Sequence, residues 1–265
     1  MPENKKSLHQ RRLEAIIDET LRLIEAAGQK IDIDDLVNEN LENENQTVLE
    51  FFHHGNLDGV VGGSLDGVDI KPNSYDDLAA ILALVCEQYA GFESVKTFVK
   101  RCNGQETPHY DHLILEEILE DTYGVIIWKE QRVALLNKLG NIPLADARKF
   151  AEKSYSPDSD IHDRFIEGVQ EKGLSAEQAQ SLFAEITDGF LAEINCNLEH
   201  YQEVAAAAYS RACLKVHYPE QFAAALKNIG WKWENSAIGS WRDVCTDEAE
   251  LRRQRKRFLD EFQNS

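Results

Sequence analysis

Apolar side chains recur every three or four residues along most of this chain, which is the spacing of an amphipathic α-helix. The pattern is clearest from His112 to Leu136, in HLILEEILEDTYGVIIWKEQRVALL, where Leu115 and Leu119 share one face and acidic residues occupy the other. Gly124 lies where the first helix ends, because glycine adopts the left-handed conformation of a C-terminal cap without steric cost. We therefore predict a buried helical hairpin here.

The same spacing predicts helices on both sides of this hairpin. Ser74 is placed to cap one of them, and Ser175 opens another, with Gln178 at the spacing of a capping box. Residues 30–46 are charge-rich, which favours solvated surface, and residues 154–160 favour a loop. The fold class is therefore all-α, a multi-helix globular domain with helical N- and C-terminal extensions. The predicted helices cover residues 8–27, 71–85, 93–101, 144–153, 161–171, 175–186, 199–216, 219–228 and 247–262.

Charge is the first property that restricts function. The chain has 47 acidic and 28 basic residues, a net charge of −19, which repels nucleic acid unless a local basic surface compensates. An acidic body of this kind suits docking on a basic partner. No run of 18 apolar residues predicts a membrane span, and five cysteines without a CxxC pair indicate reduced thiols. We expect a cytoplasmic protein with no membrane contact.

Several residues have the spacing of a chemical site, but each has a plainer interpretation. His109 and His112 flank Asp111 with HxxH spacing, yet a zinc site needs further ligands, so a structural role is favoured. Cys196 near His200 could be an activated thiol, but no third group accompanies them. We therefore predict no catalytic residue, no metal site and no cofactor.

The C-terminal residues combine a basic run with nearby tryptophans, which could contact phosphates and stack on bases. Packing of a basic helix on the protein's own acidic body is the favoured alternative. The tryptophans are Trp231, Trp233 and Trp241, and the basic residues are Arg252, Arg253, Arg255, Lys256 and Arg257.

Five or six segments, in order between Ile31 and Asn228, resemble the fingers of the alpha subunit of bacterial DNA polymerase III, a C-family replicative polymerase. They include FFHHGNLDGVV, KPNSYDDLAAILAL, TYGVIIWKEQ and LKVHYPEQFAAAL, and Phe165 to Gly168 fits the family's F-v-x-G. The resemblance implies helical fingers at residues 31–228, between an N-terminal helix at 1–30 and a tryptophan-rich linker with a basic helix at 229–265. The family's activity is DNA-directed DNA polymerisation.

The departures from the family concern phosphate chemistry. The family's palm aspartates, which hold two magnesium ions, lie upstream of the matched region and have no counterpart in the residues before it. Where the family has RRAMGKK this chain reads KFAEKSY, and where it has FNKSH this chain reads CNLEH. The resemblance leaves Lys149, Asn197 and His200 as candidate nucleotide or nucleic-acid contacts, while Glu152 and Glu199 reverse the local charge.

We therefore expect a non-catalytic fingers-like module that acts in DNA replication or repair through protein contacts or weak DNA contacts. One alternative is an acidic decoy or regulator that binds a replisome partner. Another is one part of a split DNA polymerase whose palm is on a second chain. The lost cations weigh against the split polymerase, because it would still have to bind a nucleotide triphosphate.

Overall fold

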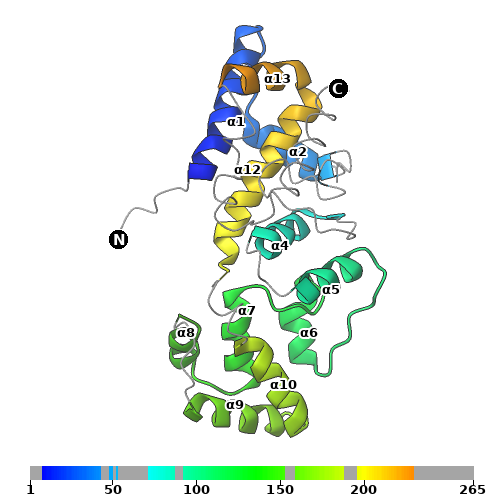
Figure 1. Cartoon of the computed structure of the whole chain (residues 1–265), viewed down its shortest axis with the longest axis vertical. Helices are drawn as coiled ribbons and strands as arrows, with labels where there is room; N and C mark the ends of the chain where they lie inside the picture. Colours follow the sequence, from blue (N-terminus) through cyan, green and yellow to red (C-terminus); the bar gives the residue numbers. More distant parts are fainter. Residues whose placement is uncertain are drawn as a thin grey trace, which may run out of the picture. The chain divides into compact units, whose positions relative to one another are not determined.

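All regular structure in the described part of the chain is helical, as predicted (Figure 1). The computed structural model describes residues 8–42, 48–49, 52, 71–86, 92–152, 159–187 and 196–229. Across these residues, no helix has both the length and the apolar character needed to cross a membrane. The helices are α1 (Leu8–Ala26), α2 (Ile33–Glu42), α4 (Tyr75–Cys86), α5 (Phe92–Cys102), α6 (Leu113–Leu119), the 3-10 helix η2 (Glu120–Thr122), α7 (Lys129–Ala134), the π-helix η3 (Leu135–Leu139), α8 (Leu144–Glu152), α9 (Ser159–Glu171), α10 (Ala176–Thr187), α12 (Leu198–His217) and α13 (Pro219–Asn228).

Helix α2 forms within residues 30–46, where solvated surface but no helix was predicted, and Asp34, Asp35 and Glu39 are exposed. The Asp32 carboxylate accepts hydrogen bonds from the backbone N–H groups of Asp34 and Asp35, at 2.9 and 3.3 Å, and so caps the helix. Ile33 and Leu36 pack against a buried cluster. These positions were recognisable in the sequence as apolar anchors, but no helix was predicted from their three-residue spacing. Helix α9 likewise begins inside the predicted loop, at Ser159.

The chain divides into two compact units. Unit 1 comprises residues 1–51, 56–64 and 207–265, and unit 2 comprises residues 52–55 and 65–206. The domain boundaries expected at residues 30 and 228 stay a prediction. The predicted helix at 247–262 lies beyond the residues that the structure describes.

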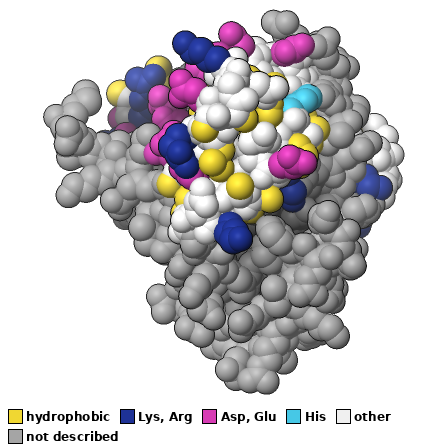
Figure 2. Space-filling view, turned by 90° about the horizontal axis from the view of Figure 1, so that it is seen from above, with side chains coloured by type: hydrophobic (Ala, Val, Ile, Leu, Met, Phe, Trp, Pro, Cys, Tyr) yellow, Lys and Arg dark blue, Asp and Glu magenta, His cyan; other side chains and the backbone are white. Residues whose placement is uncertain are grey.

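In unit 1, helix α1 packs against helix α13. Ile16 and Ile24 of α1 pack with Phe222 and Leu226 of α13 in one buried cluster. Gly28, at φ +86°, follows the end of α1, which lies within one residue of the predicted end at residue 27. In the coloured part of the face in Figure 2, acidic and basic side chains are interspersed among apolar ones, so the described residues there form no continuous basic surface.

Unit 2 is held by a core that the hairpin shares with α9 and α10. Leu136 and Leu139 of η3 are buried with Phe165 of α9. Gly140 ends η3, and α9 passes so close to it that a Cβ atom on Gly168 would lie 2.4 Å from the Gly140 carbonyl oxygen. The glycine of the F-v-x-G segment is therefore explained by backbone packing.

Burial makes two thiols poor acids. It raises the pKa of Cys102 and that of Cys213 to about 12. We expect iodoacetamide to leave both unlabelled between pH 7 and 9, although an ordinary thiol of pKa about 8.5 is largely thiolate at pH 9. The folded state holds the thiol protons of Cys102 and Cys213 more tightly than the unfolded chain does. The free energy of unfolding should therefore fall above about pH 9, by up to about 1.4 kcal/mol per pH unit for each thiol.

Peptide mass spectrometry after iodoacetamide treatment measures the labelling of Cys102 and Cys213 directly. The same reaction in about 6 M guanidinium should label both cysteines, which provides the control for peptide recovery. Labelling of folded Cys102 at pH 9 as fast as in guanidinium would contradict the assigned burial.

Candidate functional site

The turn inside the hairpin is formed by residues of the TYGVIIWKEQ segment. Tyr123 and Gly124 are both left-handed, at φ 53° and 82°, so the predicted glycine cap is confirmed and a tyrosine joins it. Arg101 Nη1 donates to the Tyr123 carbonyl oxygen at 2.8 Å, and a Cβ atom on Gly124 would lie 2.9 Å from that nitrogen. Glycine therefore provides both the conformation and the space that this turn requires.

Tyr123 also connects the turn to α4. Its hydroxyl donates to Asp77 Oδ1 at 3.0 Å, while Asp77 Oδ2 accepts from the N–H groups of Asn73 and Ser74. Ser74 Oγ accepts from the Asp77 N–H at 3.1 Å, which confirms Ser74 as the cap of α4. Burial, followed by the Asp77 charge, raises the pKa of Tyr123, so its hydroxyl stays a donor at neutral pH.

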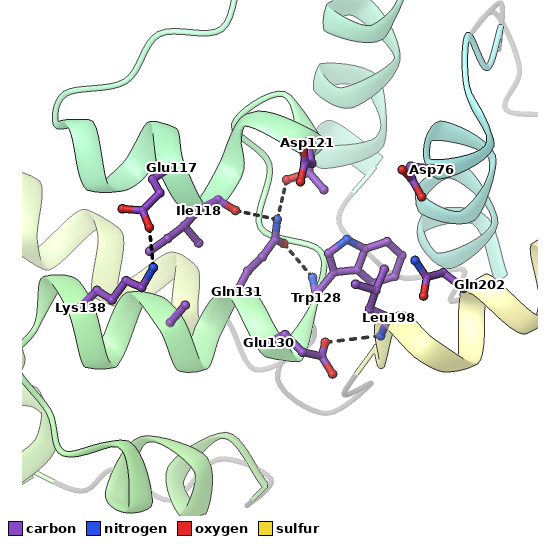
Figure 3. Close-up of a pocket in the computed structure, with 12 residues that line it drawn as sticks. Asp76, Glu117, Ile118, Asp121, Trp128, Glu130, Gln131, Lys138, Leu198 and Gln202 are labelled. Atoms are coloured by element: carbon purple, nitrogen blue, oxygen red, sulfur yellow. Dashed lines mark hydrogen bonds and ion pairs between the residues drawn. The ribbon is translucent and has the colours of Figure 1, made fainter. Parts of the chain in front are cut away.

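Gln131 is the polar centre of the hairpin (Figure 3). Its Oε1 accepts from the backbone N–H groups of Ile127 and Trp128, each at 2.9 Å. Its Nε2 donates to Thr122 Oγ1 at 2.7 Å and to the Ile118 carbonyl oxygen at 3.3 Å. One buried amide thus satisfies the extended segment between the two helices and also joins it to α6.

The start of α12 is attached to the same hairpin. The Lys129 N–H donates to the Cys196 carbonyl oxygen at 2.8 Å, and Glu130 Oε2 accepts from the Leu198 N–H at 3.3 Å. The rings of Trp128 and Tyr201 lie 6.1 Å apart. The glutamate of the KEQ sequence therefore stabilises a helix N-terminus, where negative charge is favourable.

These contacts surround an acidic cleft in unit 2, of about 350 Å³. Its described lining includes four carboxylates and one lysine, Lys138, which is paired with Glu117 at 2.6 Å. Negative charge therefore dominates the cleft. The lining residues are Asp76, Glu117, Ile118, Asp121, Thr122, Trp128, Glu130, Gln131, Ala134, Lys138, Leu198 and Gln202.

The three candidate contacts predicted from the resemblance lie outside this cleft. Lys149 is exposed on α8. Asn197 Oδ1 accepts from the His200 N–H at 3.0 Å, so Asn197 caps α12. His200 is exposed, with its ring 5.1 Å from that of Tyr201. Their role in binding stays a prediction, as does that of Arg252, Arg253, Arg255, Lys256 and Arg257, which lie outside the described residues.

The histidines of the HxxH spacing have structural partners. His112 Nδ1 accepts from the Ile114 N–H at 3.0 Å and caps α6, while His109 Nε2 lies 3.1 Å from Asp111 Oδ1. Within the described residues, no group of three or more histidines, cysteines or carboxylates is arranged to hold a metal ion. Cys196 is buried.

The acidic cleft is the feature that sequence reasoning missed. Its walls come from α4, the hairpin and the start of α12, which are far apart in the chain. Glu117 and Asp121 look in sequence like a solvated helix face. The available signal was an acidic face within the segment of strongest resemblance, and only the tertiary structure shows that this face borders a cleft.

The helical architecture and the hairpin motif define this chain as a polymerase fingers domain. Residues 14–173 match the family model described as bacterial DNA polymerase III alpha subunit finger domain, and the chain belongs to this family. It is similar to the DNA polymerase III subunit alpha of Thermus aquaticus, with 27% identity over 228 residues, covering 80% of this chain and 18% of that protein. The Aquifex aeolicus protein is 31% identical over 159 residues, covering 58% and 14%. The Helicobacter pylori protein is 28% identical over 220 residues, covering 80% and 18%.

The chain spans less than a fifth of the length of these curated relatives.

Proposed function

We propose that this chain is a fingers-like module that does not itself polymerise DNA and that acts in DNA replication or repair through contacts with other proteins. Its membership of the fingers family supports the link to replication. The loss of the family's basic residues supports the loss of polymerase chemistry, and the negative charge of the cleft agrees with it.

The basic segments that the family has and this chain lacks carry this proposal: RRAMGKK is replaced by KFAEKSY, and FNKSH by CNLEH. Transfer of a nucleotide needs cations that neutralise the triphosphate, supplied by lysine, arginine and metal ions. In the part of the chain that the structure describes, the cleft beside the hairpin is lined by four carboxylates and by one lysine, which Glu117 engages. The residues of the TYGVIIWKEQ segment make helix caps and buried hydrogen bonds, so their presence supports a retained scaffold rather than retained catalysis.

An acidic regulator that binds a replisome partner is the second candidate. The net charge of −19 favours it, because such a charge attracts basic protein surfaces and accelerates encounter with them. In both candidate functions, the non-catalytic module and the acidic regulator, the chain acts through contact with proteins rather than with phosphates.

A primer-extension assay tests the proposal. With magnesium, all four deoxynucleoside triphosphates and a primed template, we expect no extension above the level of a protein-free blank. The DNA polymerase III alpha subunit of a relative provides the positive control. Template-dependent extension by the purified chain would overturn the proposal.

Fluorescence anisotropy of a labelled primer–template then separates the two modes of contact. We expect no saturable binding below about 100 μM protein at physiological salt, since few phosphates can be neutralised. Tight binding of the primer–template that weakened steeply with added salt would show that the chain contacts DNA, and the proposed mode of action would change from protein contact to DNA contact. The result bears on the predicted phosphate contacts at Arg252 to Arg257 as well.

A further inference from the structure

The end of helix α5 holds the single Asn-Gly dipeptide of the chain in a tight turn. Asn103 and Gly104 directly follow the helix, and Gly104 is left-handed, at φ +70°. The Gly104 N–H donates to the Arg101 carbonyl oxygen at 3.0 Å, and the Gln105 N–H donates to the Lys100 carbonyl oxygen at 2.8 Å. These two hydrogen bonds form a Schellman cap at the end of α5.

An asparagine that precedes a glycine can react with its own backbone. The Gly104 nitrogen attacks Cγ of the Asn103 side chain, a carbon–nitrogen bond forms, and a cyclic imide results. The side-chain nitrogen leaves as ammonia and takes up the proton that the backbone nitrogen loses. Water then opens the imide to aspartate or isoaspartate. Glycine favours the attack because it has no side chain to shield its nitrogen, and Gly104 is exposed to solvent.

Folding closes this route, because the attacking nitrogen is itself part of the cap. Its N–H is bound to the Arg101 carbonyl oxygen, so the turn has to open before the nitrogen reaches Cγ of Asn103. Arg101 also braces the turn, since its Nε donates to Glu106 Oε1 at 2.7 Å and its Nη1 donates to the Tyr123 carbonyl oxygen at 2.8 Å. The reaction therefore requires local opening of the end of α5.

We propose that Asn103 is a site of spontaneous deamidation that the cap of α5 closes in the folded protein. The inference is independent of the proposed function. The product carboxylate would lie at the C-terminal end of a helix, where the helix dipole disfavours negative charge. Isoaspartate would in addition lengthen the backbone between the helix and Gly104, which would disturb the register of both cap hydrogen bonds. Modification would therefore loosen the helix end from which Arg101 reaches the hairpin.

Peptide mass spectrometry of the full chain, aged in mildly alkaline buffer, tests this by following the replacement of an amide NH2 by OH. In guanidinium chloride we expect Asn103 to be modified before Asn141, because the β-branched side chain of Ile142 hinders the nitrogen that would attack Asn141. In the folded protein Asn103 should react at least about tenfold more slowly than in guanidinium chloride, as expected for closure by two backbone hydrogen bonds.

Two variants of the exposed Gln105 test the cap itself. Gln105→Pro removes the N–H that donates to the Lys100 carbonyl oxygen, and it should accelerate modification of Asn103 in the folded protein about fivefold, as for the loss of one hydrogen bond. Gln105→Ala is the matched control, because it keeps the N–H, and it should change the rate less than about twofold. Circular dichroism must show that Gln105→Pro is folded. If it is not, the rates of the wild-type chain with and without guanidinium chloride still decide the question.

Equal modification of Asn103 and Asn141 in guanidinium chloride would remove the special reactivity of the Asn-Gly pair and would overturn the inference. Equal rates for Asn103 in the folded and unfolded chain would show that the cap does not close the site, and would overturn it as well. So would equal acceleration by both Gln105 variants, which would assign the protection to the glutamine side chain instead of the cap. None of these results bears on the proposed function, which the extension assay judges separately.

Discussion

Gly168→Ala is expected to destabilise the protein by about 3 kcal/mol, although alanine is ordinarily the better helix former by up to about 1 kcal/mol. A Cβ atom on Gly168 would lie 2.4 Å from the oxygen and 2.5 Å from the carbon of the Gly140 carbonyl. Both are backbone atoms, so no flexible side chain can move aside. The core would have to separate where α9 meets the end of η3.

Urea unfolding followed by circular dichroism measures this change. Gly173→Ala is the matched control, because it lies just beyond the same helix with no atom within 4 Å of an added Cβ. Its φ of +92° should make alanine cost only about 1 kcal/mol. If Gly168→Ala were neutral or stabilising, the close crossing of α9 and Gly140 would be wrong.

The positions of most helices could be predicted from the sequence because the signals are local. The caps at Ser74 and Ser175 each involve residues three or four positions apart, and both were read correctly. Gly28 and Gly124 ended helices as their conformational freedom suggested. Local rules were incomplete at α2, where the apolar positions were recognised but the high charge favoured an irregular surface segment over a helix.

Contacts between distant segments could not be predicted in the same way. The close packing at Gly168, where an added Cβ would lie 2.4 Å from the Gly140 carbonyl oxygen, depends on how α9 crosses the end of η3. Hydrophobic periodicity along the chain does not specify such a crossing. The acidic cleft has the same origin, because Asp76 and Gln202 are far apart in the chain. The resemblance directed attention to Lys149 instead, at a position where the family carries basic residues.

Gln131→Leu is expected to destabilise the protein by about 4 kcal/mol, since each buried polar group left without a partner costs about 1–3 kcal/mol. Leucine is close to glutamine in volume, so no large cavity accounts for the effect. The variant removes the acceptor of the Ile127 and Trp128 N–H groups and the donor to Thr122 Oγ1. All three residues are buried, so water cannot readily replace the amide.

Gln178→Ala is the matched control, because it removes a glutamine side chain whose hydrogen bond to the backbone is exposed rather than buried. Gln178 Oε1 also accepts a backbone N–H, that of Ser175 at 2.8 Å, but the bond is exposed, so its loss should cost only about 1 kcal/mol. Hydrogen exchange should in addition accelerate at Ile127 and Trp128 in Gln131→Leu alone. A loss no greater than that of Gln178→Ala would mean that the TYGVIIWKEQ segment does not depend on its glutamine for folding. Its resemblance to polymerases would then need an explanation other than packing, and a direct role of Gln131 in binding at the cleft would be the first to examine.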